Sequence, residues 1–246
     1  MKKLLKTILT VMLLSVVCLS TEAVERKKLN FNSEWRLQVG DFPDAVKADF
    51  DASCWRQVTL PYAFNGDEAF RKDIVDLTDT IVWYRKTFEV KSGEVKSEKF
   101  FVEFEGVRQG ADFYLNGHHL GFSENGVMAC GFDLTPYIIE GENVLAVRCD
   151  NSWTYRSREY DSRYQWNDRN FNANYGGIPK NVWLHVTDKL YQTLPLYSNL
   201  GTTGTYIYAT DFDIANHKAV IHAESQVRNE DTKERSFTFF AQVLDA

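Results

Sequence analysis

The chain has 246 residues, of which 44% are hydrophobic and 25% charged, a composition typical of soluble globular proteins. Its formal net charge of -6 argues against a nucleic-acid partner, because phosphate binding requires a basic surface. The length indicates one or two domains.

Residues 1–23 have the pattern of a signal peptide. Three lysines stand among the first six residues, and the apolar run that follows, residues 8–19, is too short to span a bilayer. Small side chains before the end of this segment predict cleavage after Ala23. A lipoprotein would use Cys18, but Val17 is larger than the residue that normally precedes a lipidated cysteine. We therefore expect an exported protein, periplasmic or secreted, with no membrane span.

Residues 24–188 are rich in strand patterns. Residues 81–90 alternate with period two, and residues 99–106 place Phe100, Val102 and Phe104 on one face, which is typical of a sheet with one buried face. Asn116-Gly117 predicts a tight hairpin turn, because this pair tolerates positive φ angles. Further strands are expected in residues 141–150 and 180–186, and no convincing helical periodicity interrupts them. This region predicts an all-β fold, a jelly-roll β-sandwich.

Residues 189–246 predict a second unit. A connector rich in Thr, Gly and Ser leads into three strand-like runs, 205–210, 219–229 and 236–246, with a charged hairpin tip at 229–235. An immunoglobulin-like sandwich needs about seven strands and about 100 residues. We therefore expect an incomplete immunoglobulin-like β-sandwich, truncated partway, in a fragment of a longer protein.

The cysteines do not indicate a disulfide framework. Without Cys18 the chain has Cys54, Cys130 and Cys149, a number both odd and small. Cys149 lies in a strand pattern and is expected to be a small buried side chain. One disulfide among the three is compatible with an oxidising compartment, and the pairing stays open.

The ordered motifs of this chain resemble glycoside hydrolase family 2, the β-galactosidases, β-glucuronidases and β-mannosidases. "CWRQVTLPYAF", "VWYRKTFEV" and "NYGGIPKNVWLHV" follow one another at the expected spacings. The resemblance implies a jelly-roll sugar-binding domain, an immunoglobulin-like domain and a (β/α)₈ barrel with two catalytic glutamates. It favours a β-galactosidase, a carbohydrate as partner, and neither cofactor nor metal. The alternative is a stand-alone, non-catalytic carbohydrate-binding module.

The catalytic barrel is expected to be missing from this chain. Retaining glycoside hydrolysis needs two carboxylates about 5–5.5 Å apart. A barrel to hold them takes about 250 residues, and no region here alternates strand with helix. The resemblance places the acid/base in an Asn-Glu pair, and Asn229-Glu230 is the only such pair; we expect it to be a solvated turn. No catalytic residue is therefore predicted, and the chain should be inactive alone.

The segment "QWNDRNFNANYGGIPKNVWLHV" holds the predicted substrate-binding residues. By resemblance, Asp168 is the first candidate for an active-site rim, and the alternatives are Asn170, Asn172 and Asn174. Their carboxylate and amide groups can bind sugar hydroxyls, and Trp166 offers a stacking face. The opposing interpretation is a long loop that Asn and Asp side chains brace through its own backbone.

A second rim candidate, Asp79, with Asp76 behind it, precedes the strand at 81–90; the alternative is an ordinary turn. Residues 151–166 are rich in aromatics and arginines and are expected to pack against the barrel rather than to line the rim. We expect Tyr175 and Ile178 to serve packing and Gly176-Gly177 to form a tight turn. A zinc site at His118-His119 is not expected, because no third ligand lies at metal spacing.

Overall fold

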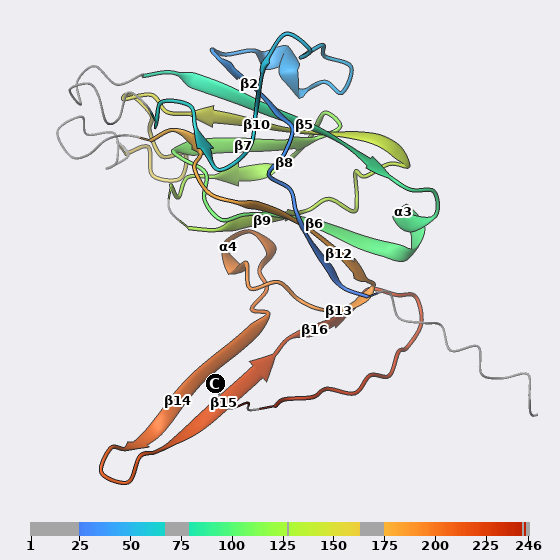
Figure 1. The fold of residues 1–246 in the computed structure, drawn as a ribbon, viewed down its shortest axis with the longest axis vertical. Coiled ribbons are helices and arrows are strands. Elements are labelled where there is room, and N and C mark those ends of the chain that lie inside the picture. The colour runs from blue at the N-terminus through green and yellow to red at the C-terminus, as the bar shows by residue number, and fades with distance from the viewer. Residues whose placement is uncertain (1–24, 67–78, 127, 163–174, 243, 245–246) are drawn as a thin grey trace, which may run out of the picture.

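Two antiparallel sheets face each other in the computed structural model, which describes residues 25–66, 79–126, 128–162, 175–242 and 244 (Figure 1). The four-stranded sheet has the order β1-β12-β6-β9, and the six-stranded sheet has the order β3-β2-β5-β10-β7-β8. The predicted all-β fold built on a β-sandwich is confirmed.

The sandwich strands have three to ten residues, and the chain crosses between the two sheets several times. The four-stranded sheet comprises β1 (Lys27–Asn30), β6 (Glu98–Phe104), β9 (Cys130–Asp133) and β12 (Val182–Asp188). The six-stranded sheet comprises β2 (Trp35–Val39), β3 (Arg56–Val58), β5 (Ile81–Val90), β7 (Gly110–Leu115), β8 (His118–Ser123) and β10 (Gly141–Asp150). The minor elements are η1 (Pro43–Val46), β4 (Tyr62–Ala63), α3 (Glu94–Ser97) and β11 (Gly177–Ile178).

The predicted alternation of β6 places its apolar face in the core. Phe100, Val102 and Phe104 are buried between the two sheets. The ring of Phe104 meets that of Phe113 from β7 at a centroid distance of 4.9 Å. Burial of such large side chains is the main stabilising contribution to the sandwich.

The outer face of the six-stranded sheet is also covered. The sequence pattern predicted a sheet with one buried face, so this second buried layer differs from the prediction. Trp83 of β5 is 1% exposed and packs with Trp55 from the segment that includes η1. Arg85 is buried beside it and donates to the backbone carbonyls of Ala45 and Lys47, among others. The irregular segment therefore offers this guanidinium the hydrogen bonds that burial requires.

The hairpin predicted at Asn116-Gly117 is confirmed. It joins β7 to β8, and both residues have positive φ angles, 51° and 86°. The Asn116 side chain also accepts a hydrogen bond from the Val144 N–H at 2.8 Å, so it ties the turn to β10.

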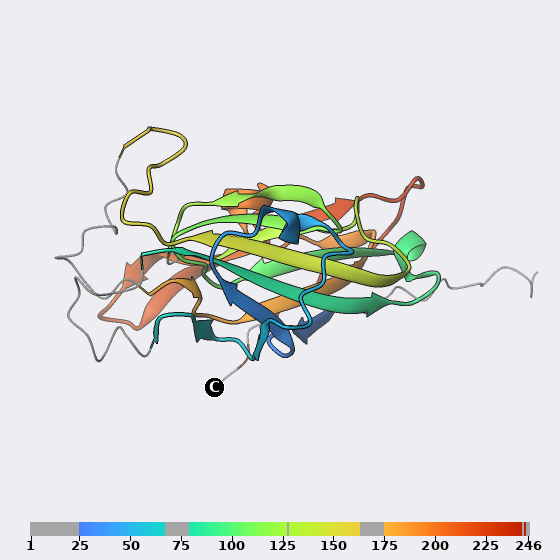
Figure 2. The same ribbon diagram turned by 90° about the horizontal axis from the view of Figure 1, so that it is seen from above.

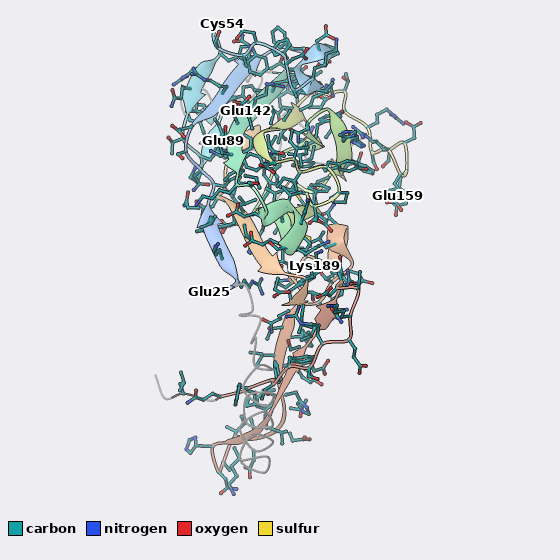
Figure 3. The ribbon with its side chains drawn as sticks, turned by 90° about the vertical axis from the view of Figure 1, so that its right-hand side faces the viewer. Glu25, Cys54, Glu89, Glu142, Glu159 and Lys189 are labelled. Atoms are coloured by element: carbon teal, nitrogen blue, oxygen red, sulfur yellow. The ribbon has the colours of Figure 1, made fainter. Side chains whose placement is uncertain are left out.

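The second unit begins by packing on the sandwich. It contains β13 (Leu190–Gln192), α4 (Tyr197–Leu200), β14 (Thr205–Asp213), β15 (Lys218–Ser225) and β16 (Val227–Asn229). Tyr191, Leu194 and Leu196 form a small apolar cluster with Phe101 on the outer face of β6. Lys189 marks this junction in Figure 3.

Glu230 is exposed, as its sequence context predicts, but its side chain also makes contacts that the sequence did not predict. Its carboxylate accepts hydrogen bonds from the Lys99 ammonium at 2.7 Å and from the Tyr191 hydroxyl at 2.6 Å. Lys99 also bonds Asp133 at 2.6 Å. The expected charged hairpin tip is instead an ionic contact between β16 and the sandwich, because β16 pairs with β13 beside β6.

The last part of the chain differs from the three expected strands. β14 and β15 pair only with each other among the described residues, and they project away from the sandwich (Figures 1 and 3). β15 ends at Ser225, so the run predicted at 219–229 is two strands. Residues 236–242 and 244, the described part of the third run, form no strand. Apolar alternation alone does not make a strand, because a strand also needs a hydrogen-bonding neighbour.

The three cysteines that the structure describes are free thiols. Cys149 is fully buried, as predicted, and Cys130 is buried as well, whereas Cys54 is exposed. Burial raises the pKa of Cys130 to about 12, so this thiol stays neutral at physiological pH.

Candidate substrate-side site at one end of the sandwich

Four segments that are distant in the sequence meet at one end of the sandwich. β4 pairs with β11, and the Gly176 N–H donates to the Asn65 side-chain oxygen at 2.9 Å. The Asn151 N–H donates to the Thr80 carbonyl at 3.0 Å. These bonds join residues 62–66 to 175–178 and residues 79–80 to 151–153. A Cβ atom on Gly176 would lie 2.7 Å from the Asn151 side chain, so the two pairs are also in contact.

Gly176 and Gly177 allow these segments to approach closely. A Cβ atom on Gly177 would lie 2.0 Å from the Tyr84 hydroxyl oxygen, and its φ angle is +88°. A Cβ atom on Gly176 would lie 2.2 Å from the Phe64 ring. The predicted tight turn is wrong in one respect: Gly177 belongs to β11 and pairs with Ala63. Close packing and the positive φ angle, rather than a turn, require glycine here.

Asp79 is the one predicted rim residue that the structure describes. Its carboxylate is exposed and accepts a hydrogen bond from the Trp153 N–H at 2.7 Å. Ile178 is fully buried, which confirms its predicted packing role, and Tyr175 is half-buried. The other candidates lie outside the described residues, namely Asp76, Trp166, Asp168, Asn170, Asn172 and Asn174.

Residues 67–78 and 163–174 lie outside the described part of the chain. Described residues next to both segments lie at this same end of the sandwich. Asn65 and Asp79 flank one gap, and Tyr175, bonded through Gly176 to Asn65, follows the other. The anchor points of both predicted rim segments therefore converge, although they are separated by about a hundred residues in sequence.

Residues 151–162 form a projecting loop at this end, drawn in yellow in Figure 2. Glu124, which follows β8, holds it through three hydrogen bonds: from the Tyr155 hydroxyl at 2.7 Å, the Ser157 hydroxyl at 3.1 Å and the Arg158 N–H at 2.8 Å. Burial and the Glu124 carboxylate together raise the pKa of Tyr155 well above its usual range. The loop is thus fixed to the sandwich of its own chain.

Asp112 of β7 provides a second anchor for the loop. The Arg158 guanidinium binds its carboxylate through two bonds, of 2.8 Å and 2.5 Å. Burial alone would raise the pKa of Asp112, but the bonds from Arg158 and His119 outweigh it and lower the pKa. Sequence reasoning missed both Glu124 and Asp112; the one available signal was a carboxylate within the apolar strand pattern of β7.

His118 and His119, where no zinc site is expected, each contact a neighbouring side chain. His118 stacks on Tyr137 at a centroid distance of 4.5 Å, and His119 Nε2 lies 3.0 Å from Asp112 Oδ1. Among the described residues, no three His, Cys, Asp or Glu side chains gather as a metal site would require. In the same part of the chain, no helix is both long and apolar enough to cross a membrane.

Comparison with known proteins identifies the family. Residues 20–188 match the sugar binding domain of glycosyl hydrolases family 2. A β-glucuronidase of Formosa agariphila is 37% identical over 230 residues, which cover 90% of this chain and 23% of that protein. β-Galactosidase BoGH2A of Bacteroides ovatus is 30% identical over 237 residues, 93% of this chain and 25% of that protein.

A solved structure agrees with these sequence matches. A β-glucuronidase from glycoside hydrolase family 2 superimposes with a TM-score of 0.74 and 35% identity, over 85% of this chain and 22% of that one. The chain therefore belongs to glycosyl hydrolases family 2, and residues 20–188 are its sugar binding domain. It spans about a quarter of the length of these curated relatives.

Proposed function

We propose that this chain is the substrate-side, sugar-binding part of an exported β-glycosidase that hydrolyses β-galactosides. The family match over residues 20–188 is the observation that carries this proposal. Convergence of the Asn65, Asp79 and Gly176 segments supports it, because loops anchored there can add polar groups to an active-site rim. Asp79 and Asp168 are the proposed contacts to sugar hydroxyls.

The charges of the projecting loop favour a neutral sugar. A glucuronide carries a carboxylate, and its recognition calls for a free cationic side chain. Arg158 is bound to Asp112, and Arg156 is bound to Asp161 at 2.8 Å. Both loop arginines within the described residues are therefore already neutralised. A β-glucuronide remains the second candidate substrate, because the Formosa agariphila relative is a β-glucuronidase.

The catalytic carboxylates are proposed to come from a further domain of a longer parent protein. Near the rim, the described carboxylates Asp112 and Glu124 are engaged by donors of their own chain, so they hold structure rather than exchange protons with a substrate. The stand-alone binding module is the rival proposal. It would bind sugar with no catalytic partner.

Enzyme assays test the proposal. The chain alone and the complete gene product would be incubated with nitrophenyl β-galactoside, β-glucuronide and β-mannoside. We expect turnover only by the complete product, fastest on the galactoside, and an Asp168→Ala variant with kcat/KM lowered about tenfold or more. Turnover by the chain alone, if it persists after repurification, would contradict the proposal that the catalytic carboxylates come from a further domain. A faster reaction on the glucuronide would reassign the substrate.

Export is proposed from the residues at the N-terminus. Mass spectrometry of the protein from the producing cell's periplasm or medium should find a mature chain that starts at Val24. Retention of residues 1–23 on a cytoplasmic protein would overturn this part of the proposal.

A further inference from the structure

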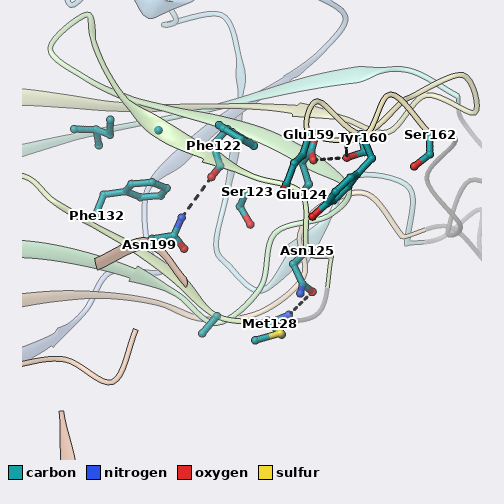
Figure 4. A pocket seen from close by; sticks show the side chains of 14 residues that line it. Phe122, Ser123, Glu124, Asn125, Met128, Phe132, Glu159, Tyr160, Ser162 and Asn199 are labelled. Atoms are coloured by element: carbon teal, nitrogen blue, oxygen red, sulfur yellow. Dashed lines mark hydrogen bonds between the residues drawn. The ribbon is translucent and has the colours of Figure 1, made fainter. Parts of the chain in front are cut away.

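A cleft beside the rim lies between β8, β9, the projecting loop and α4. Its volume is about 800 Å³, within the range of small-molecule sites. Figure 4 shows Glu159 and Tyr160 on one side and Asn125 and Met128 on another, with Asn199 of α4 closing the far end. Both the sandwich and the second unit therefore build its walls.

The cleft combines aromatic surface with hydrogen-bonding groups. Tyr160 is 73% exposed and Phe122 is 42% exposed, and each presents ring surface to the opening. Amide, hydroxyl and carboxylate groups stand beside these rings, among them Asn125, Ser162 and Glu159. Ring faces that stack on C–H surfaces, together with groups that bind hydroxyls, are what a carbohydrate needs.

The wall that carries Tyr160 is held in place before any ligand arrives. Glu124 and Asp112 fix the loop through the Tyr155, Ser157 and Arg158 bonds described above. The Arg158 guanidinium also covers one face of Phe122 at 4.9 Å. A preorganised wall lowers the entropy that binding must offset, so an exposed tyrosine held in this way is suited to contact a ligand.

The charge of the cleft selects among sugars. Its lining, so far as the structure describes it, holds two carboxylates, Glu124 and Glu159, and no basic side chain. An anionic sugar would be repelled, whereas a neutral one would find hydrogen-bond acceptors. We propose that this cleft is a second carbohydrate site, beside the rim, which binds a short neutral galactose-containing oligosaccharide. The sugar class rests on the proposed function; the site itself does not.

Titration of the chain with β-1,4-galactotriose, followed by amide NMR shifts, tests the site. We expect saturable shifts around residues 120–132 and 157–162 at sugar concentrations up to about 10 mM. Tyr160→Ala should weaken binding about tenfold, and Tyr160→Phe should restore most of it because the ring remains. Tyr206→Ala, which removes an exposed tyrosine of the distant β14–β15 hairpin, should leave binding unchanged.

The charge of the sugar provides an independent test of the proposed site. Methyl β-galactoside should shift the same signals, and methyl β-galacturonide, which differs by a carboxylate at C6, should not at equal concentration. No saturable shift with the trisaccharide, shifts located elsewhere, or equal affinity of Tyr160→Ala and the unaltered chain would each overturn the site. Because hydrolysis is not measured, failure here leaves the proposed β-glycosidase role standing, and failure of the enzyme assay leaves this site standing.

Discussion

Trp35 and Phe104 of the sandwich are fully buried, whereas Ile207 and Phe212 of the β14–β15 hairpin expose about two thirds of their surfaces. Both regions satisfy backbone hydrogen bonds by antiparallel pairing. They differ in that the inner strands of the sandwich have a neighbour on each edge and are covered by side chains of the facing sheet, whereas the hairpin strands pair only with each other among the described residues. Backbone pairing defines a strand, but burial of its apolar side chains stabilises it.

Proteolysis should show the largest difference. Ile214, in the turn between β14 and β15, is 79% exposed. Thermolysin should cut there at least about a thousandfold faster than within the sandwich, which opens only at a free energy near that of global unfolding. Timed digestion with mass spectrometry measures both rates. Similar rates in the two regions would remove the contrast.

This digestion also tests the boundary proposed near Lys189. Residues 190–204 and β16 pack on the sandwich, so they should survive in the protected core even after the hairpin is cut. Loss of β16 together with the hairpin would instead support a boundary at residue 188.

A matched pair of phenylalanines compares the regions directly. Phe104→Ala should lower the free energy of unfolding by about 3–5 kcal/mol, because it empties part of the core. Phe212→Ala should change it by less than about 0.5 kcal/mol. Urea denaturation of both variants gives the values. A large loss at Phe212 would mean that the hairpin is covered in solution.

A pair of glycines sharpens the comparison inside the sandwich. Gly177→Ala should cost about 2–4 kcal/mol, since the new methyl group meets the Tyr84 hydroxyl and the φ angle is positive. Gly93→Ala, at a similar φ angle of +89° with no atom within 4 Å of the added carbon, should cost only about 1 kcal/mol. Equal costs would show that backbone strain, not packing, governs Gly177.

The ionic contact at Glu230 should have the smallest effect, and that effect should depend on pH. Burial would raise the pKa of Glu230, but the bonds from Lys99 and Tyr191 outweigh burial and lower the pKa. A lowered folded-state pKa gives stability that is present above the unfolded-state value and is lost as pH falls through the folded-state value.

Glu230→Gln should therefore cost about 0.5–1 kcal/mol at pH 7, because the carboxylate is partly exposed, and progressively less as the pH falls below the usual range of a carboxyl group. Parallel thermal melts of the variant and the unaltered chain at pH 7 and at lower pH values measure the difference. A cost that does not change with pH would rule out the ion pair as its source.

Much of the sandwich could be predicted because its signals are local. The period of two in β5 and β6 and the Asn116-Gly117 turn depend on neighbours in sequence. The cover over Trp83 could not be predicted, because residues 40–55 have no periodicity of their own. Likewise, the strand predicted at 236–246 had the right side chains but no pairing partner that its own sequence could reveal.

The position of the site could be predicted from the sequence, but the hydrogen-bond partners of its residues could not. Asp79 and Gly176-Gly177 do lie at one end of the sandwich. Glu124 and Asp112 escaped notice because the loop residues that they bind stand more than thirty residues away. The contact of Glu230 with Lys99 was missed for the same reason, since Lys99 is distant in sequence.

The pairing of β1 with β12 has a further consequence. Lys27 stands opposite Val186, so the chain enters and leaves the sandwich side by side. β12 also runs away from the segment at 175–178, so the points where the chain enters and leaves the sandwich lie at the opposite end from the rim. A unit with adjacent ends can be spliced into a host protein without stretching either junction. The two ends of the sandwich therefore have the arrangement that insertion into another protein requires.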